Sequence, residues 1–220
     1  MEITKAGKSY KIREGTIDDF VVHEGCYSKL NFNKEDVWFD IGGNIGAFCV
    51  QYSDKVKQMI SFEPEIDNYD LLVHNLELNN IQNVIAYNYA VVGNEDKSRE
   101  FYVYDGKNKG KHSLIPNSRS TKISISCANI NTMLERFKPN KLKVDTEGAE
   151  IEILYAIKDF SNITEIIMEY HFMQLKDKHK TIYFDLLSFM KTKSLIPTSI
   201  IDADAKYQPT CIIHFKRSIV

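Results

Sequence analysis

The sequence has almost no surplus of charge of either sign. Its 220 residues include 28 lysines and arginines against 30 aspartates and glutamates, which gives a formal net charge of -2. Proteins that bind nucleic acids or anionic membranes by general electrostatic attraction carry an excess of basic residues over a broad face. The charge balance therefore gives no reason to expect a nucleic-acid partner.

Long apolar runs and paired cysteines are missing as well. Residues 1–10 are polar, and no run approaches the roughly 18 apolar residues of a membrane-spanning helix, so we expect neither a signal peptide nor a transmembrane segment. No Cys-x-x-Cys pair or zinc-like Cys/His spacing occurs. We interpret the cysteines as buried thiols and expect a protein of the reducing cytoplasm. The cysteines are Cys26, Cys49, Cys127 and Cys211.

The remaining composition is typical of a globular domain. Hydrophobic residues make up 43% of the chain and charged residues 26%, and 220 residues are enough for one large domain with a sizeable core. We expect a main domain over residues 35–220, preceded by an irregular cap segment over residues 1–34.

From residue 37 onward, short apolar runs alternate with segments of helical period, which is the pattern of β-α-β units and a mostly parallel sheet with helices on both faces. Apolar residues at i, i+3, i+4 and i+7 predict helices around 69–76 and 183–190, and further helices are expected over 44–56 and 150–160. The last two strands could close the sheet as an antiparallel pair, with the final one at its edge. The seven predicted strands are 37–41, 59–63, 84–92, 142–145, 165–171, 198–201 and 210–216.

Residues 97–128 break this alternation. Apolar and polar residues alternate around Phe101 and again around Ile125, on either side of a stretch rich in glycine and lysine. The pattern predicts a small β insertion with a mobile tip, and we expect this insertion to choose the acceptor.

A glycine-rich loop, Asp40-Ile41-Gly42-Gly43-Asn44-Ile45-Gly46, follows a predicted strand and opens a helix. Glycines at such a turn let a ligand approach the backbone, and the helix N-terminus presents unpaired N–H groups. Glu63 ends the next predicted strand, where a carboxylate can accept hydrogen bonds from both hydroxyls of a ribose. The combination predicts a cofactor that contains a ribose.

The spacing of this loop favours S-adenosylmethionine over a dinucleotide. The dinucleotide fingerprint is G-x-G-x-x-G, and when it is aligned on Gly43 and Gly46 its first glycine falls at Ile41. Asp40 also adds a carboxylate, which repels a pyrophosphate but attracts the ammonium group of a methionine. In the alternative interpretation, the loop is an ordinary tight turn and Glu63 is a surface residue, and neither binds a cofactor.

Two polar clusters follow the fourth and fifth predicted strands, where open α/β sheets bind their ligands. Asp145 would orient the methionine part of the cofactor or the acceptor. The segment after Asp145 lacks the proline-aromatic motif that stacks a flipped base in nucleobase methyltransferases, so we expect a hydroxyl acceptor. His171 is the first candidate for the base that removes the hydroxyl proton, unless it only caps its strand. His112 is a weaker candidate, since we interpret it as a solvated loop residue.

The acidic residues near Asp145 leave a metal site as an alternative. Asp145, Glu147 and Glu150 could hold a divalent cation, because hard cations favour carboxylate oxygens, and the two glutamates could share a helix face. In the competing interpretation, these acids interact favourably with the dipole at the first turn of the helix. The sequence does not favour the metal.

Between Gly15 and Phe172, five segments of the sequence resemble the FkbM-type methyltransferases in their residues, order and spacing. The segments are 40–46, Phe62-Glu63-Pro64, Asn75-Leu76-Glu77-Leu78-Asn79, 143–150 and Met168-Glu169-Tyr170-His171.

The resemblance implies a class I, Rossmann-like methyltransferase fold and O-methylation, often of sugars in polysaccharides or glycolipids, or of natural products such as macrolides. Gly43 stands where the family loop has an alanine. The residues carried over are Asp40, Gly42 and Asn44 against the methionine part, Glu63 against the ribose, Tyr89 and Ala90 beside the adenine, and Asp145 and Glu147 at the reaction site.

We therefore expect an S-adenosylmethionine-dependent O-methyltransferase that acts on a small molecule or a glycan. Two alternatives remain open at this point: an NAD(P)-dependent oxidoreductase, and a catalytically silent module that binds S-adenosylmethionine. The sequence does not define the acceptor or the oligomeric state.

Overall fold

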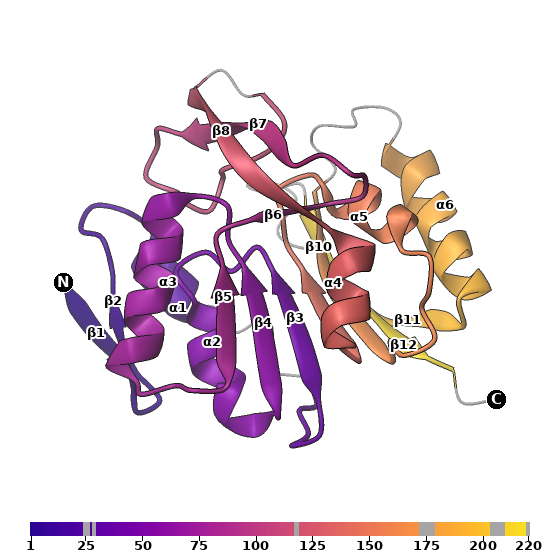
Figure 1. Cartoon of the computed structure of the whole chain (residues 1–220), viewed down its shortest axis with the longest axis horizontal. Helices are drawn as coiled ribbons and strands as arrows, with labels where there is room; N and C mark the ends of the chain where they lie inside the picture. Colours follow the sequence, from indigo (N-terminus) through magenta and orange to yellow (C-terminus); the bar gives the residue numbers. More distant parts are fainter. Residues whose placement is uncertain (24–26, 28–29, 117–118, 172–178, 203–209, 219–220) are drawn as a thin grey trace.

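A seven-stranded, mostly parallel sheet forms the centre of the structure (Figure 1). The structure is a computed structural model that describes residues 1–23, 27, 30–116, 119–171, 179–202 and 210–218. From one edge to the other, its strands are β11 (Leu195–Asp202), β12 (Thr210–Arg217), β10 (Glu165–His171), β9 (Lys141–Val144), β3 (Val37–Ile41), β4 (Gln58–Phe62) and β5 (Val84–Tyr87). The five strands from β10 to β5 are parallel, whereas β12 runs antiparallel to β10 and β11. The predicted α/β class and mostly parallel sheet are confirmed.

Two details of the predicted sheet are wrong. The last strand is not at the edge, because β12 pairs with β10 on one side and β11 on the other, which leaves β11 as the edge strand. The single strand expected over 84–92 is two strands, β5 and β6 (Ala90–Val92), which belong to different sheets. The chain turns between them at Asn88, whose side-chain amide donates to the carbonyl oxygens of Glu63 and Pro64 at 2.9 and 3.0 Å.

Helices cover both faces of the sheet, as Figure 1 shows. Neighbouring residues on a strand point to opposite faces, so Trp38 packs in one core cluster and Phe39 in the other. On the Trp38 face lie α2 (Ala47–Tyr52), α3 (Ile66–Leu78) and the N-terminal elements β1 (Glu2–Lys5), β2 (Lys8–Lys11) and α1 (Asp18–His23). On the Phe39 face lie α4 (Ile130–Phe137), α5 (Glu150–Ala156) and α6 (His179–Thr192).

The helix expected over 44–56 begins later than predicted. Asn44 and Gly46 have φ values of 48° and 82°, so the left-handed turn continues to Gly46, and α2 starts at Ala47. Helix α4 was not predicted, although the sequence carries signals for it. The Asn129 side chain accepts hydrogen bonds from the N–H groups of residues 131 and 132, and apolar residues recur at positions 130, 133, 134 and 137.

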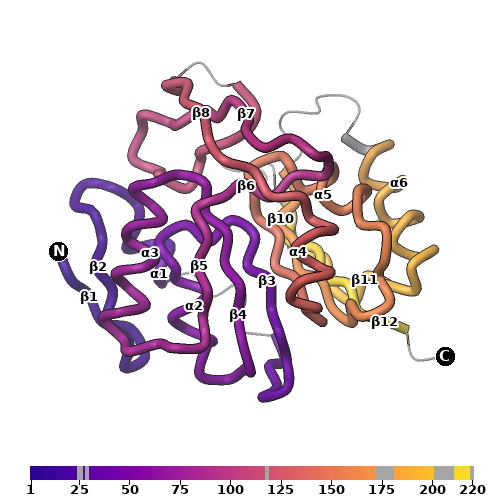
Figure 2. Tube along the Cα trace, in the orientation of Figure 1, coloured from indigo at the N-terminus to yellow at the C-terminus, as the bar shows by residue number. Residues whose placement is uncertain are grey.

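A small three-stranded sheet lies over the carboxyl ends of the central strands (Figures 1 and 2). It contains β6, β8 (Ser120–Asn129) and β7 (Ser98–Tyr104) in that order, so the segment expected to form a β insertion supplies two of its strands. After β7 the chain folds back, and the backbone groups of Tyr102 and Ser113 exchange hydrogen bonds at 2.8 and 3.2 Å. This fold brings the intervening loop toward the end of the main sheet.

Cys49, Cys127 and Cys211 are buried free thiols, as predicted, and Cys26 lies outside the described residues. Within the described ranges, no helix has both the length and the apolar character needed to cross a membrane.

Candidate active site

A pocket opens at the carboxyl ends of the central strands, where β3 and β9 lie side by side and the chain order of the strands reverses. Open α/β sheets bind ligands at such a switch point. The pocket has about 1000 Å³ of atom-free space, a volume that includes its open mouth. The predicted site residues that line it are Gly42, Asn44, Glu63, Tyr89, Ala90, Asp145 and Glu147.

The glycine loop is held so tightly that side chains have no room in it. The N–H groups of Gly42 and Gly43 both donate to the last carbonyl oxygen of β4, at 2.9 and 3.0 Å. A Cβ on Gly42, whose φ is 89°, would lie 1.7 Å from the carbonyl oxygen of Asp145. Cβ atoms on Gly43 and Gly46 would lie 2.7 and 3.1 Å from the Leu72 side chain. Gly42 therefore shapes the pocket floor, while the other two glycines pack the loop against α3.

Asp40 lies beneath this loop and not in the pocket. Its side chain is fully buried, and its Oδ2 accepts hydrogen bonds from Ser61 Oγ at 2.9 Å and from Cys49 Sγ at 3.2 Å. Its Oδ1 pairs with Lys143 Nζ at 3.0 Å. Asp40 therefore does not line the pocket, and its predicted direct contact with the methionine part stays a prediction.

Lys143 connects the glycine loop to Asp145. Its Nζ donates to the Gly42 carbonyl oxygen at 2.8 Å and lies 3.6 Å from Asp145 Oδ2, while it also pairs with Asp40. Burial lowers the pKa of Lys143, but the carboxylates of Asp40 and Asp145 outweigh the effect of burial and raise this pKa above its ordinary value. No role of Lys143 was predicted, because the partner of a lysine inside a buried strand cannot be read from its spacing in the sequence.

Glu63 is held at the pocket wall by three donors. Its Oε2 accepts from Asn44 N at 2.7 Å, and its Oε1 accepts from Glu65 N at 3.0 Å and Asn68 Nδ2 at 3.4 Å. Burial raises the pKa of Glu63 to about 7 in spite of these hydrogen bonds. A carboxylate offers about four lone-pair sites, so acceptor capacity remains for a ligand.

Two further acceptors beside Glu63 have no partner in the part of the chain that the structure describes. They are the buried oxygens Asn44 Oδ1 and Asn68 Oδ1, and both residues line the pocket. Buried polar atoms are nearly always paired in folded proteins. This wall of the pocket therefore suits a ligand rich in hydrogen-bond donors, such as the hydroxyls of a ribose.

Tyr89 and Ala90 lie at the next strand end, where the chain passes from the main sheet to the small one. The Tyr89 ring is 37% exposed and stacks against Tyr87, with ring centroids 5.9 Å apart. A flat aromatic ring beside a small residue offers a surface on which a purine can pack.

His171 lies behind the pocket wall among carboxylates. Its Nδ1 is 3.0 Å from Glu150 Oε1, which also accepts from the N–H groups of Thr146 and Gly148 at 3.0 and 2.9 Å. Its Nε2 faces Glu147 Oε2 at 3.4 Å. Glu147 has a φ of 55° and precedes α5, so it does not share a helix face with Glu150 as one interpretation required.

The electrostatics of this group disfavour His171 as the base. Burial lowers its pKa, but the hydrogen bond and charge of Glu150, followed by the charges of Glu147 and Asp145, outweigh burial and raise the pKa to about 10. An imidazolium cannot take up a proton. Burial also raises the pKa of Glu147 to about 7, against the opposing charge of His171. Glu147 lines the pocket, whereas His171 does not.

His112 was expected to be a solvated loop residue, and that expectation is wrong. The side chain is buried and lines the pocket, and its Nδ1 accepts a hydrogen bond from Tyr104 N at 2.8 Å. Burial, with the charges of Lys109 and Arg13, lowers the pKa of His112 to about 4. The neutral ring therefore carries its proton on Nε2.

Two segments outside the main sheet also line the pocket: the start of α1, which was not expected at the site, and the insertion, which was expected to choose the acceptor. The start of α1 contributes apolar residues, and β7 with the loop after it contributes both apolar and polar ones. The two segments meet where Ile17 N donates to Lys107 O at 3.2 Å. Asn68 Nδ2 donates to Lys109 O at 3.0 Å and fixes the loop over α3. The additional lining residues from these segments are Ile17, Phe20, Val21, Phe101, Asn108, Gly110, His112 and Leu114.

The chain matches a known protein family in sequence and a solved structure in fold. The sequence profile of the methyltransferase FkbM domain matches residues 40–195. The structure resembles a crystal structure of methyltransferase FkbM from Methylobacillus flagellatus, with a TM-score of 0.57 and 14% identity over 86% of this chain and 45% of that one. At this identity the likeness shows a common fold only.

Two curated proteins are similar in sequence. Methyltransferase 1 of Beauveria bassiana is 25% identical over 178 residues, which cover 70% of this chain and 71% of that protein. The hexuronic acid methyltransferase AglP of Haloferax volcanii is 29% identical over 139 residues, which cover 63% of this chain and 57% of that protein.

Proposed function

The chain belongs to the FkbM family and is an S-adenosylmethionine-dependent methyltransferase, and from this premise we propose that it methylates a hydroxyl group of a small molecule, a sugar of a glycan or glycolipid or a natural product. The observation that carries the proposal is the pair of carboxylates, Asp145 and Glu147, at the pocket beside the glycine loop. The name of the Haloferax relative supports a sugar acceptor.

The cofactor fits the wall of the pocket that runs from Gly42 to Tyr89. Gly42 and Asn44 would hold the methionine part, Glu63 the ribose, and Tyr89 with Ala90 the adenine. Support comes from the spare acceptor capacity of Glu63 and from the buried oxygen Asn44 Oδ1, which has no partner within the described ranges. We assign Asp40 an indirect role, because its ion pair with Lys143 fixes the carbonyl oxygen of the glycine loop.

Bound S-adenosylmethionine would supply an electrophilic methyl group: a bond would form between the acceptor oxygen and the methyl carbon as the carbon–sulfur bond breaks, and the hydroxyl would lose its proton. We assign that proton to a carboxylate oxygen of Glu147, since Glu147 lines the pocket where His171 does not. Alignment of the two reactants contributes much of the rate of such a displacement. Asp145, next to the lysine-anchored loop, would orient the acceptor.

His171 then acts as a positioning residue. Glu150 holds its Nδ1, and its Nε2 faces the Glu147 carboxylate. This contact keeps Glu147 directed toward the same side of the pocket. A small-molecule acceptor is favoured over a nucleic acid by the charge balance of the chain, and this exclusion remains a prediction.

The experiment has two steps. Calorimetric titration with S-adenosylhomocysteine, with NAD and NADP as parallel ligands, tests the cofactor, and we expect binding of the first alone. Transfer of a labelled methyl group is then measured on neutral sugars, uronic acids, glycolipids and an RNA transcript. Labelling of a sugar hydroxyl supports the proposal. Labelling of the RNA alone would overturn it, and binding without transfer to any acceptor would favour a silent module.

A further inference from the structure

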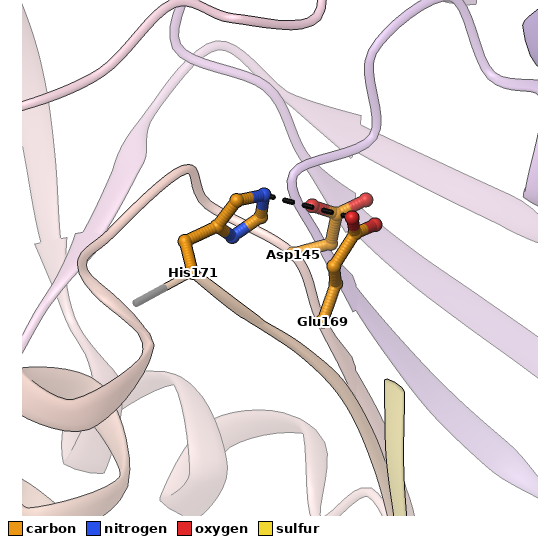
Figure 3. Close-up of side chains that lie close together, drawn as sticks. All are labelled: Asp145, Glu169 and His171. Atoms are coloured by element: carbon orange, nitrogen blue, oxygen red, sulfur yellow. Dashed lines mark ion pairs between the residues drawn. The ribbon is translucent and has the colours of Figure 1, made fainter. Parts of the chain in front are cut away.

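Three side chains of metal-binding type converge at the ends of two neighbouring strands (Figure 3). Asp145 directly follows β9, and Glu169 and His171 lie on β10, which pairs with β9 in parallel. One ligand atom from each of the three lies within 4.8 Å of the other two. Among the described residues, no other group of histidine, cysteine and acidic side chains meets this geometry.

Glu150 orients His171 in the way that metal-binding histidines are usually oriented. Its Oε1 already accepts hydrogen bonds from Thr146 N and Gly148 N, so it is an ionised acceptor, and the Nδ1–H of His171 is the donor at 3.0 Å. A histidine that binds a metal through one ring nitrogen commonly donates the N–H of its other ring nitrogen to a carboxylate, and this hydrogen bond fixes the orientation of the ring and its tautomer. The other nitrogen, Nε2, is thereby directed at the carboxylates, with Glu169 Oε1 at 3.7 Å and Glu147 Oε2 at 3.4 Å.

Carboxylates gather around this point. Four of them, from Asp145, Glu147, Glu150 and Glu169, surround one imidazole. Lys143 pairs with Asp145 and is shared with Asp40, and the charge of Lys111 acts on Glu147. Asp145, Glu147 and Glu169 also line the pocket, so a cation from solvent has a path to them.

We propose that Asp145, Glu169 and His171 bind one divalent cation, with Glu147 beside it, and that this cation holds the acceptor hydroxyl. At metal–ligand distances of about 2.1 Å, neighbouring ligand atoms on one ion lie about 3.0–3.4 Å apart, so ligand atoms that are now within 4.8 Å of one another close by up to about 2 Å on binding. One imidazole and two carboxylates suit Mn²⁺, Fe²⁺ or Zn²⁺ better than Ca²⁺, which prefers oxygen alone. Binding displaces any proton held on Nε2.

Mn²⁺ is the probe for the test, because its paramagnetic resonance reports binding without any methyl transfer. Mn²⁺ is titrated into the full chain in the presence of S-adenosylhomocysteine. We expect one tightly bound Mn²⁺ per chain, with a hyperfine coupling from one imidazole nitrogen in the pulsed spectrum. Glu169→Gln should weaken Mn²⁺ binding at least tenfold. Glu100→Gln, which removes an exposed carboxylate that pairs with Lys122 and does not line the pocket, is the matched control and should change nothing.

The possible outcomes test the cation site and the proposed function separately. The role of the cation in holding the acceptor rests on the proposed function, whereas the binding of the cation does not. Binding of S-adenosylhomocysteine without bound Mn²⁺ would overturn the cation site and leave the methyltransferase intact. Bound Mn²⁺ without a nitrogen coupling would overturn the assignment of His171. If Glu169→Gln does not fold, the nitrogen coupling in the unmodified protein still decides. Failure of both ligands to bind would count against the proposed function as well.

Discussion

Gly42→Ala should be far more damaging than the same substitution at another glycine of similar backbone conformation. Gly42 has a φ of 89°, and its added Cβ would lie 1.7 Å from the Asp145 carbonyl oxygen and 2.8 Å from the carbonyl carbon. Both atoms are backbone, so neither can move aside by a rotamer change. The end of β3 would be pushed away from the segment that follows β9.

The size of the effect can be worked out from two contributions. The left-handed conformation costs alanine about 1–2 kcal/mol. Overlap with a closely packed neighbour adds about 1–3 kcal/mol. Gly42→Ala should therefore lower the free energy of unfolding by about 2–5 kcal/mol. Gly7 offers the matched control, because its φ is 78° and nothing lies within 4 Å of its added Cβ, so Gly7→Ala should lose only the first contribution.

Urea unfolding of both variants measures the two losses, and calorimetry with S-adenosylhomocysteine measures the effect on the pocket. We expect at least a tenfold loss of affinity for Gly42→Ala, because Gly42 lines the pocket, and unchanged affinity for Gly7→Ala. Equal losses of stability in the two variants would refute the argument, since the close approach to Asp145 would then contribute nothing.

Three further outcomes follow from the site. Glu147→Gln should lower kcat by about 10²-fold or more and leave the affinity for S-adenosylhomocysteine within about twofold, as single-turnover kinetics and calorimetry will show; unchanged kcat would remove Glu147 as the base. Burial raises the pKa of Glu63 to about 7, and we assign the ribose hydroxyls to its ionised form, so affinity for S-adenosylhomocysteine should fall about tenfold from pH 8 to pH 6, and Glu63→Gln should abolish that dependence. Asp40→Asn should cost up to about 3–5 kcal/mol of unfolding free energy, because it removes the closer of the two carboxylates that pair with Lys143, and adding Lys143→Met should restore part of it; no recovery would mean that the ion pair is not the cause.

Much of the sheet could be predicted from the sequence, because buried parallel strands are short apolar runs bounded by polar residues. The runs 37–41 and 165–171 match β3 and β10 residue for residue. The break after residue 87 and the inner position of β12 could not be predicted. Both depend on which distant strand pairs with each run, and apolar content does not distinguish an inner strand from an edge strand when both are apolar.

The candidate site was predictable where residues sit at strand ends, since the carboxyl ends of parallel strands meet at one edge. Glu63 and Asp145 reach the pocket for that reason. The pairing of Asp40 with Lys143 and of His171 with Glu150 was not predictable, because each depends on distances between elements far apart in the chain. The burial of His112 depends likewise on the return of the loop after β7 to the main sheet.

The inner position of β12 has a consequence for the order in which a newly made chain acquires its site. Translation delivers the strands from β3 to β10 first, and β10 then has an open edge until residues 210–217 emerge. About 40 residues separate the end of β10 from β12, which takes a few seconds at roughly 5–20 residues per second. The glycine loop and Glu63 are thus made before the strand that carries Glu169 and His171 can have both neighbours. The residues assigned to the cofactor are therefore all present in the growing chain earlier than the complete surroundings of those assigned to the acceptor.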